Sequence, residues 1–269
     1  MKERIGIMGC GWLGFPLAKR LAASGYTVCG TTTTKGNLDI LKSEGISPFY
    51  VELFEGGVKG QLIPFLKDID MLVINVPPGR KGAAGAYLKK MAQLHEAIRI
   101  MHISRILFVS STSVYGDIQG EVTEKTTPKP ATATAKDLWA VERLFMEDPL
   151  LKTTTVRFGG LIGPDRHPVT FLSGQKNLKN GDDIINLIHL EDCLLLLEAI
   201  IANEWWGVLY NGVYPYHPTK RTYYTTEARK RGLAVPEYLK GYAGKTGKLV
   251  MAKALEEAGF HFSKPIDSV

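Results

Sequence analysis

Residues 5–14 read Ile5-Gly6-Ile7-Met8-Gly9-Cys10-Gly11-Trp12-Leu13-Gly14, a short apolar run followed by the pattern G-x-G-x-x-G. In this pattern the first glycine permits a tight turn, the second lets a pyrophosphate approach the backbone, and the third lets a helix pack closely on the strand. Leu13, Leu17 and Leu21 then recur at helical spacing. The pattern therefore follows a predicted strand and opens a predicted helix, as a dinucleotide site requires. The alternative is a glycine-rich turn without a ligand.

Working outward, short β-rich apolar runs alternate with helical patterns over the first 110 residues. The predicted strands are 5–8, 27–31, 48–51, 71–76 and 106–110. An amphipathic helix is predicted over 86–101. This alternation predicts a doubly wound, Rossmann-type α/β fold, with a parallel sheet covered by helices on both faces.

The second half of the chain continues with fewer such elements. We predict a helix near 135–147, a strand at 154–158, a helix at 192–203 and a strand at 207–211. The remaining stretches are richer in Pro, Gly, Tyr and Lys. We therefore expect a dinucleotide-binding domain of residues 1–163 plus 184–212, and a small C-terminal substrate-covering lobe of residues 164–183 plus 213–269.

Composition excludes several classes of protein. The 269 residues are 45% hydrophobic and 22% charged, which is typical of a globular chain. The net charge of +6 is spread without a basic run, so we expect no nucleic-acid partner. No apolar run approaches the ~18 residues of a membrane-spanning helix. Because the amino end lacks a cleavable signal pattern and Cys10, Cys29 and Cys193 show no metal spacing, we expect a cytoplasmic protein without a metal.

The end of the second predicted strand decides which dinucleotide fits. NAD sites place an acidic residue there, about 20 residues beyond the glycines, to bind the ribose 2′-hydroxyl. This chain instead has Thr31, Thr32, Thr33 and, two residues later, Lys35, while Asp39 lies too far along. Hydroxyls and a cation suit a 2′-phosphate, so we predict NADP rather than NAD. Alternatively, the threonines are ordinary strand and turn residues and Lys35 is solvated.

The loop after the fourth predicted strand is a further candidate for the cofactor site. Val76, Pro77 and Pro78 occupy the position that passes the nicotinamide-side ribose in doubly wound folds. Arg80 and Lys81 follow, and either meet a phosphate or carboxylate of the substrate or belong to a solvated loop.

A second informative stretch runs Ser110-Ser111-Thr112-Ser113-Val114-Tyr115-Gly116. Together with the glycine pattern it resembles the extended branch of the short-chain dehydrogenase/reductases, which contains sugar-nucleotide epimerases and dehydratases. Segments 157–164, 188–192 and 210–212 agree in order and spacing, so the resemblance spans about residues 4–265. It implies that Ser111 binds the reacting oxygen of the substrate, that Ser113 adds a pocket hydroxyl and that Ser110 lies by the cofactor. The alternative is that residues 110–113 only cap a strand end.

The chain departs from this family at one important place. The family's redox chemistry uses Tyr-x-x-x-Lys on the following helix, where the ammonium lowers the pKa of the phenol. Aligned on Glu142, the two positions are Thr134 and Leu138, and no tyrosine occurs between Tyr115 and Tyr210. Neither replacement can perform this proton transfer. The resemblance is therefore to an atypical member that keeps the cofactor site and lacks the pair.

Other candidates receive a structural interpretation. Tyr216 and Lys220 have the right spacing, but Pro218 between them breaks the required helix. His189 and Asp192 could form an acid–base pair, although fixing a helix start is the simpler interpretation. His167 and His217 are isolated, Tyr115 and the Trp205-Trp206 pair suit a core or an interface, and no metal is expected.

A second resemblance concerns the amino-terminal half. Residues 9–18 and 75–78 are similar to 3-hydroxyacid dehydrogenases of the 6-phosphogluconate type, whose catalytic lysine lies on a helical C-terminal domain. The C-terminal hundred residues here lack a helical-bundle pattern, which favours the epimerase branch.

Two functions remain open. The first is an NADP-binding enzyme of the epimerase/dehydratase or oxidoreductase type, acting on a sugar nucleotide or a similar polar anionic small molecule, with Ser111 polarising the reacting oxygen and Ser113 assisting. The second is a non-catalytic NADP-binding sensor, which the missing Tyr and Lys favour. The resemblance also makes a homodimer an expectation.

Overall fold

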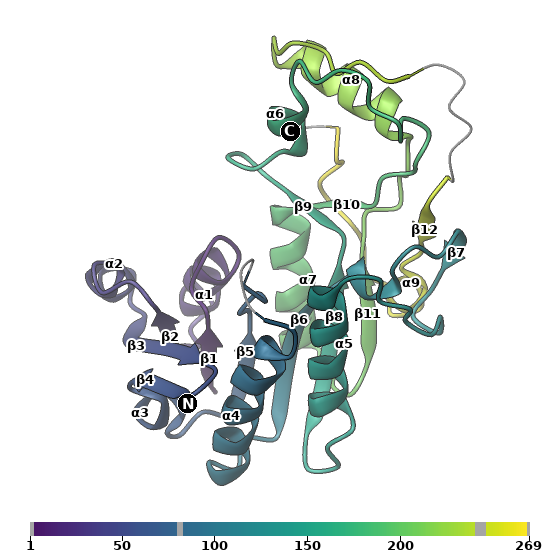
Figure 1. Cartoon of the computed structure of the whole chain (residues 1–269). Helices are drawn as coiled ribbons and strands as arrows, with labels where there is room; N and C mark the ends of the chain where they lie inside the picture. The colour runs from purple at the N-terminus through teal and green to yellow at the C-terminus, as the bar shows by residue number, and fades with distance from the viewer. Residues whose placement is uncertain (1–2, 80–82, 240–245, 268–269) are drawn as a thin grey trace.

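The central feature of the fold is an eight-stranded sheet (Figure 1). The computed structural model of the chain describes residues 3–79, 83–239 and 246–267. All strands of the sheet are parallel except β4, which pairs antiparallel with β3 at one edge. In spatial order, the strands are β11 (Leu209–Gly212), β8 (Lys152–Phe158), β6 (Arg105–Ser111), β5 (Met71–Ile74), β1 (Arg4–Met8), β2 (Thr27–Thr32), β3 (Ser47–Phe54) and β4 (Gly57–Gly60).

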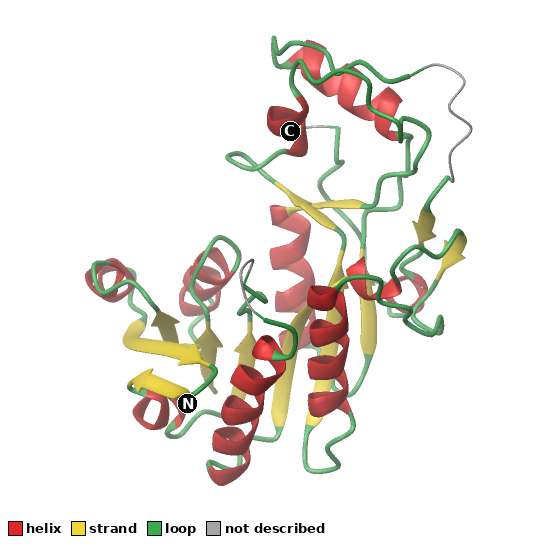
Figure 2. Cartoon of the chain, in the orientation of Figure 1, coloured by secondary structure: helices red, strands yellow, loops and turns green. Residues whose placement is uncertain are grey.

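Helices cover both faces of this sheet (Figure 2). One face packs against α1 (Gly14–Ala23), α2 (Asn37–Ser43), α7 (Leu190–Ala202) and α9 (Lys253–Glu257). The other packs against α3 (Leu62–Leu66), α4 (Ala86–Ile100) and α5 (Ala133–Met146). Because successive side chains of a strand point to opposite faces, Ile7 belongs to the first core and Met8 to the second. The parallel strands are thus buried on both sides, which explains their near-continuous apolar sequences.

This architecture confirms the predicted doubly wound fold. The parallel strands from β3 to β8 follow the Rossmann order, with β1 flanked by β2 and β5. The order reverses between β1 and β5, and ligands of open α/β sheets bind outside the carboxyl ends of the strands at such a point. No helix in the described part of the chain has the length and apolarity needed to cross a membrane.

A smaller lobe lies beyond the carboxyl ends of β8 and β11 (Figure 1). Its elements are β9 (Gly160–Ile162), α6 (Pro168–Leu172), β10 (Leu187–His189) and α8 (Lys220–Lys230). They share a core of their own, which consists of Ile162, Val169, Ile185, Leu187, Tyr223, Tyr224, Ala228 and Ile266. Beside it, the one-turn helix η1 (Thr112–Tyr115) follows β6, and the short parallel strands β7 (Gly120–Val122) and β12 (Lys248–Val250) pair with each other.

The C-terminal segment differs in part from the expected division. We expected residues 213–269 in the small lobe, but Leu255 of α9 is fully buried in the main core, and Phe260 and Phe262 pack against that core. Ile266 then returns to the core of the lobe. The apolar residues of this segment therefore belong to two cores, which composition alone does not reveal. No helical bundle follows the sheet in the described residues, unlike the second family considered above.

Candidate functional site

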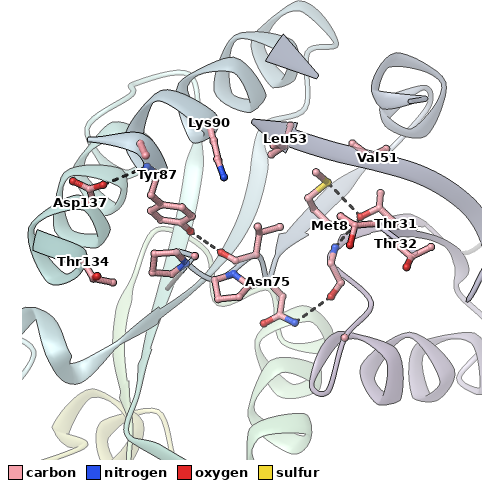
Figure 3. A pocket seen from close by; sticks show the side chains of 18 of the residues that line it. Met8, Thr31, Thr32, Val51, Leu53, Asn75, Tyr87, Lys90, Thr134 and Asp137 are labelled. Atoms are coloured by element: carbon pink, nitrogen blue, oxygen red, sulfur yellow. Dashed lines mark hydrogen bonds between the residues drawn. The ribbon is translucent and has the colours of Figure 1, made fainter. Parts of the chain in front are cut away.

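A cavity of about 420 Å³ opens at the carboxyl ends of β1, β2 and β5, where the strand order reverses (Figure 3). Its volume lies in the range of small-molecule and cofactor sites. The predicted cofactor residues that line it are Gly9, Cys10, Gly11, Thr31, Thr32, Thr33, Val76, Pro77 and Pro78. Further lining side chains that the sequence did not single out include Asn37, Leu53, Asn75, Tyr87, Lys90 and Asp137.

The three glycines of the loop after β1 have different reasons for lacking a side chain. Gly9 has φ of +103°, and a Cβ there would lie 2.6 Å from the carbonyl oxygen of Asn75. A Cβ on Gly14 would collide with the carbonyl oxygen of Gly9. A Cβ on Gly11, in contrast, would meet no atom of the described chain within 4 Å. The fold requires Gly9 and Gly14, while the space beside Gly11 is open to a ligand.

The start of α1 adds a polar feature to this open space. Leu13 is its N-cap residue and provides no side-chain hydrogen bond to the first turn. The first N–H groups of a helix have no partner within the helix, and together with its dipole they favour an anion. The N–H of Phe15 already donates to the carbonyl oxygen of Gly11 at 2.9 Å, and Pro16 has no N–H. A dinucleotide pyrophosphate therefore fits the loop with the N–H groups of Trp12, Leu13 and Gly14 as candidate donors.

Three hydrogen bonds fix the loop that carries Gly9. The N–H of Gly9 donates to Oγ1 of Thr31 at 2.9 Å, and the N–H of Cys10 donates to the carbonyl oxygen of Thr31 at 2.8 Å. Nδ2 of Asn75 donates to the carbonyl oxygen of Gly9 at 3.2 Å. Thr31 is 2% exposed, so its hydroxyl is committed to the loop. Its role is to position the cofactor loop.

The end of β2 presents hydroxyls to the cavity but not the expected cation. Thr32, Thr33 and the following Thr34 line the cavity. Lys35 does not, since its ammonium lies 5.9 Å from the centre of the Tyr50 ring and outside the lining. Among the described residues, Lys90 of α4 is the cation that lines the cavity instead, and Figure 3 shows its amine extending toward the space beside Leu53. No carboxylate at the end of β2 is among the lining residues.

The loop after β5 is held against α4 and α5. The buried hydroxyl of Tyr87 donates to the carbonyl oxygen of Val76 at 2.7 Å, and burial raises the pKa of this phenol well above its usual range. The carboxylate of Asp137 accepts from the N–H of Gly85 at 2.8 Å, at the start of α4. It also accepts from the N–H of Tyr87 at 3.3 Å (Figure 3). Val76, Pro77 and Pro78 thus lie at the cavity wall. Arg80 and Lys81 lie outside the described residues.

Five predicted cofactor residues, Trp12, Leu13, Gly14, Lys35 and Ser110, lie outside the lining of this cavity. Leu13 is 3% exposed and packs in the core with α1. Trp12 turns toward the small lobe, where the guanidinium of Arg166 lies 5.0 Å from its ring centre. The side chains of these two residues serve packing, and their backbone N–H groups remain the candidates for contact with a pyrophosphate.

Ser110 belongs to a buried polar network under the carboxyl ends of β6, β8 and β11. Its hydroxyl donates to Oε1 of Glu142, and the same carboxylate binds the guanidinium of Arg157. Burial alone would lower the pKa of Arg157, but the bond to Glu142 reverses this and keeps it above its ordinary value. The network fixes Ser110 away from the cofactor cavity.

Tyr115 is part of the same network. Its ring lies 4.8 Å from the Arg157 guanidinium, and its hydroxyl donates to Oδ1 of Asn211 at 2.9 Å. It is fully buried, and burial raises the pKa of its phenol. The tyrosine therefore serves the structure, as its sequence position suggested.

Ser111 and Ser113 lie at a second cavity of about 470 Å³, at the carboxyl ends of β6 and β8. Oγ of Ser111 accepts from the N–H of Ser113 at 3.1 Å, which caps η1. Because this bond uses only a lone pair, the hydroxyl proton of Ser111 is free to donate to a ligand oxygen. The structure thus combines the capping role with a place at a cavity. Arg166 and Lys248 line the same cavity, and sequence analysis missed both.

The helix register inferred from Glu142 places the two replaced positions clearly. Thr134 lies on the first turn of α5 and lines the first cavity (Figure 3). Leu138, one turn later, is 3% exposed and belongs to the core between the sheet and α3, α4 and α5. The residue that the sequence aligns with the lysine of the resembled dehydrogenase/reductases is therefore a core side chain.

The remaining candidates have structural roles. Tyr216 lies in an exposed loop, and Nζ of Lys220, at the start of α8, pairs with Asp183 at 2.8 Å. His189 caps α7 by accepting from the N–H of Glu191, and buried Asp192 binds the N–H and hydroxyl of Ser263. The contact of His189 agrees with its helix-start interpretation, whereas Asp192, on the first turn of α7, holds the C-terminal segment instead. In the residues described, no group of His, Cys, Asp and Glu could hold a metal ion.

The strand order and the helices on both faces define the chain as an α/β protein with a Rossmann-type fold. Solved structures with this fold include a functionally unknown conserved protein from Silicibacter pomeroyi, with a TM-score of 0.80, 22% identity, and 99% of this chain and 96% of that chain covered. They also include UDP-glucuronic acid 4-epimerase from Bacillus cereus in complex with NAD, with a TM-score of 0.81, 16% identity, and 98% and 93% covered. A third is DesIV, the dTDP-glucose 4,6-dehydratase from Streptomyces venezuelae, solved with NAD bound. Its TM-score is 0.79 and its identity 17%, with 98% of this chain and 93% of that chain covered.

Sequence comparison identifies the particular family. The chain is 34% identical over 266 residues to protein YeeZ of Escherichia coli strain K12, covering 98% of this chain and 97% of the relative. The chain belongs to the family of protein YeeZ. No model of a known protein family matches it.

Proposed function

We propose that the protein binds a nicotinamide dinucleotide, preferably NADP, and acts on a sugar nucleotide or a similar polar anionic small molecule, as an enzyme of the epimerase/dehydratase or oxidoreductase type. The observation that carries this proposal is the open space beside Gly11, at a cavity where the Rossmann strand order reverses. When bound, the nicotinamide would accept and return a hydride. The loop 9–11, Thr32, Thr33 and the loop 76–78 would hold the cofactor.

The preference for NADP is supported by the charges around the first cavity. The residues that line it near β2 offer the hydroxyls of Thr32, Thr33 and Thr34 and no carboxylate. The cation of Lys90 lines the same cavity. Asp137 also lines it, but its carboxylate is occupied by the N–H groups of Gly85 and Tyr87. A 2′-phosphate would meet donors and a cation without a nearby unpaired anion.

The second cavity supports a role in binding a substrate oxygen. Its lining includes the carboxyl ends of β6 and β8, the strands that continue the sheet beyond β5. Ser111 can donate a hydrogen bond to a hydroxyl or carbonyl oxygen, and exposed Ser113 adds a second hydroxyl. Arg166 supplies positive charge that suits a phosphate or carboxylate of the substrate.

A non-catalytic NADP sensor is the second candidate. It is favoured by Leu138, a buried side chain at the position where the resembled dehydrogenase/reductases have their lysine. In that case the cofactor would change a contact with a partner, and no hydride would be exchanged.

The compartment that we propose for either function is the cytoplasm. The three cysteines, Cys10, Cys29 and Cys193, are free, which supports a reducing compartment.

Titration with NADPH, NADP⁺, NADH and NAD⁺, followed by fluorescence and melting temperature, tests the cofactor. A ligand at 100 times its Kd raises the free energy of unfolding by about 2.7 kcal/mol, which is readily measured. We expect stabilisation by all forms that bind, strongest for NADP(H). If none of the four binds, both functions are refuted.

A substrate screen then separates the enzyme from the sensor. UDP- and dTDP-sugars are incubated with the cofactor-loaded protein, and hydride exchange or epimerised product is measured. The enzyme predicts turnover that Ser111→Ala abolishes and Ser111→Thr, which keeps the hydroxyl, retains in part. Cofactor-linked stability without turnover on any compound of the panel supports the sensor.

A further inference from the structure

We propose that Lys248 is the acid–base residue of the second cavity and replaces the tyrosine–lysine pair that α5 lacks. This inference rests on the proposed function of the same cavity. Lys248 comes from β12, more than a hundred residues after the serines, and lines the cavity together with Ser111, Ser113 and Arg166. A different route through the fold thus brings a lysine to the cavity of the serines.

The backbone holds Lys248 firmly beside η1. β12 pairs in parallel with β7, with Lys248 opposite Gly120. The carbonyl oxygen of Lys248 accepts from Nδ2 of Asn186 at 2.8 Å, and the neighbouring Gly247 N–H donates to Oε1 of Gln119 at 3.0 Å. The strand that carries the lysine is therefore fixed on both sides, which a proton-transfer group needs.

The amine itself is also held in place. Nζ of Lys248 donates to the carbonyl oxygen of Gly116 at 2.9 Å. Gly116 is the C-cap residue of η1, whose N-cap is Ser111. The one-turn helix thus connects the serine and the amine rigidly, and one neutral acceptor leaves the amine two of its three N–H positions.

The surroundings of Lys248 favour the neutral form of its amine more than water does. Burial lowers its pKa, and the negative charge of Asp117 partly opposes this. In the described residues, no carboxylate oxygen forms an ion pair with its Nζ. Arg166 faces the same cavity, and the adjoining cavity of about 390 Å³ contains Asp183 and Lys220, which neutralise each other. A desolvated lysine without a carboxylate partner is typical of catalytic amines.

The proton step follows from this arrangement. In the oxidation of a substrate alcohol, for which a bound nicotinamide would supply the hydride acceptor, the hydroxyl proton would pass to the neutral amine of Lys248. The C–O bond becomes C=O and the amine becomes an ammonium. Ser111 donates a hydrogen bond to the same oxygen, and the reverse step returns the proton with the hydride.

Trace reductive methylation with formaldehyde and cyanoborohydride tests whether the amine is neutral and accessible. At neutral pH we expect Lys248 to react at least about tenfold faster than exposed Lys136 of α5, because only the unprotonated amine attacks the aldehyde. Mass spectrometry of the two peptides measures the ratio. Lys248→Arg should lose this fast site, while Lys136→Arg should keep it. A rate equal to that of Lys136 would overturn the proposal.

Dinucleotide titration of the same proteins keeps this inference separate from the proposed function. If the wild type binds no dinucleotide, the proposed function fails. If the wild type and Lys248→Arg bind a dinucleotide equally well, but Lys248 of the wild type is methylated slowly, only this inference fails. On a substrate from the screen, Lys248→Arg should lower kcat about a hundredfold with little change in KM, since a guanidinium stays protonated. The variant should also lose the rise of kcat/KM with pH that a deprotonating amine gives. Unchanged kcat would refute the role of Lys248.

Discussion

The hydroxyl oxygen of Thr31 accepts the N–H of Gly9 at 2.9 Å, across the gap between the ends of β1 and β2. The same threonine accepts the N–H of Cys10 through its carbonyl oxygen. One buried residue of β2 therefore fixes the shape of the loop in which a pyrophosphate fits.

Replacing Thr31 with Val tests this link. Val matches the shape of Thr but leaves the Gly9 N–H without its acceptor, so we expect a loss of about 1–3 kcal/mol in the free energy of unfolding and weaker cofactor binding. Thr31→Ser keeps the hydroxyl and is the control. Urea denaturation and dinucleotide titration measure both effects. Equal stability of Thr31→Val and Thr31→Ser would contradict the positioning role.

Gly11 and Gly14 provide a matched pair of substitutions. Gly11→Ala meets open space and has no positive φ, so stability should stay within about 0.5 kcal/mol while NADPH affinity falls at least about tenfold. Gly14→Ala pushes a methyl group into the carbonyl oxygen of Gly9 and should cost about 2–3 kcal/mol. Thermal unfolding with and without NADPH distinguishes them. If Gly11→Ala bound NADPH as tightly as the wild type, the ligand would not bind on that side of the loop.

Thr33→Asp tests the choice of dinucleotide. Thr33 is exposed at the cavity, so stability should change by no more than about 0.5 kcal/mol. The new carboxylate should repel a 2′-phosphate and bind a ribose 2′-hydroxyl, which weakens NADPH at least about tenfold relative to NADH. The ratio of the two Kd values is measured by fluorescence. Tighter NADH binding by the wild type would already refute the preference.

We predict that protonation of His167 lowers the stability of the fold in mild acid. It is 3% exposed, its Nδ1 accepts the N–H of Val169, and Nε2 lies 3.0 Å from the Tyr223 hydroxyl. Burial, and after it the charge of Arg231, lowers the pKa of His167 from 6.5 to about 4.

The sign follows from proton binding. Between pH 6.5 and 4 the unfolded chain takes up a proton that the folded chain excludes, so stability is full above 6.5 and falls toward 4. With allowance for solvent screening and for nearby Glu227, we expect about 2 kcal/mol. Urea denaturation across this window measures the loss. His167→Asn cannot ionise, and a slope as steep as that of the wild type would assign the effect to other groups.

Asp192 should anchor the C-terminal segment. Its fully buried carboxylate accepts the N–H of Ser263 at 2.8 Å and that of Lys264 at 3.2 Å. Asp192→Asn would turn an amide against these donors, at a cost of about 2–4 kcal/mol. Glu191→Gln, which loses only the partly exposed pair with Arg20, should cost less than about 1 kcal/mol. Hydrogen exchange of residues 260–267 should rise in the first variant alone.

Much of the sheet was predictable because its strands are buried on both faces. The pattern of β1, β2, β5, β6 and β8 gave their places within one or two residues. α8 gave no such signal, because its sequence Lys220–Lys230 is mostly polar and its buried stripe of Tyr223, Tyr224, Glu227 and Ala228 includes a carboxylate. The shortest strands, such as β9 and β12, are fixed by pairing partners that lie far away in the sequence.

The candidate site was predictable where it follows a local motif. Gly9, Gly11 and the threonines after β2 reach the first cavity because the motif itself builds it. Lys35 does not reach this cavity, because its ammonium lies over the ring of Tyr50 in a cation–π contact. Lys248 carried no signal at all, since only the pairing of β12 with β7 brings it to the serines.

The path of the chain through the small lobe has a mechanical consequence. The backbone leaves the sheet after β8, returns through β10 into α7, leaves again after β11, and reappears in α9 before Ile266 closes the core of the lobe. Proteins that open by rotation bend at a few residues of a narrow connection. Here rotation about any one connection would stretch the others, so the lobe resists rotation relative to the sheet. Substrate entry would then be controlled by the side chains at the mouth of the second cavity, and the lobe could not be transplanted as a separate module.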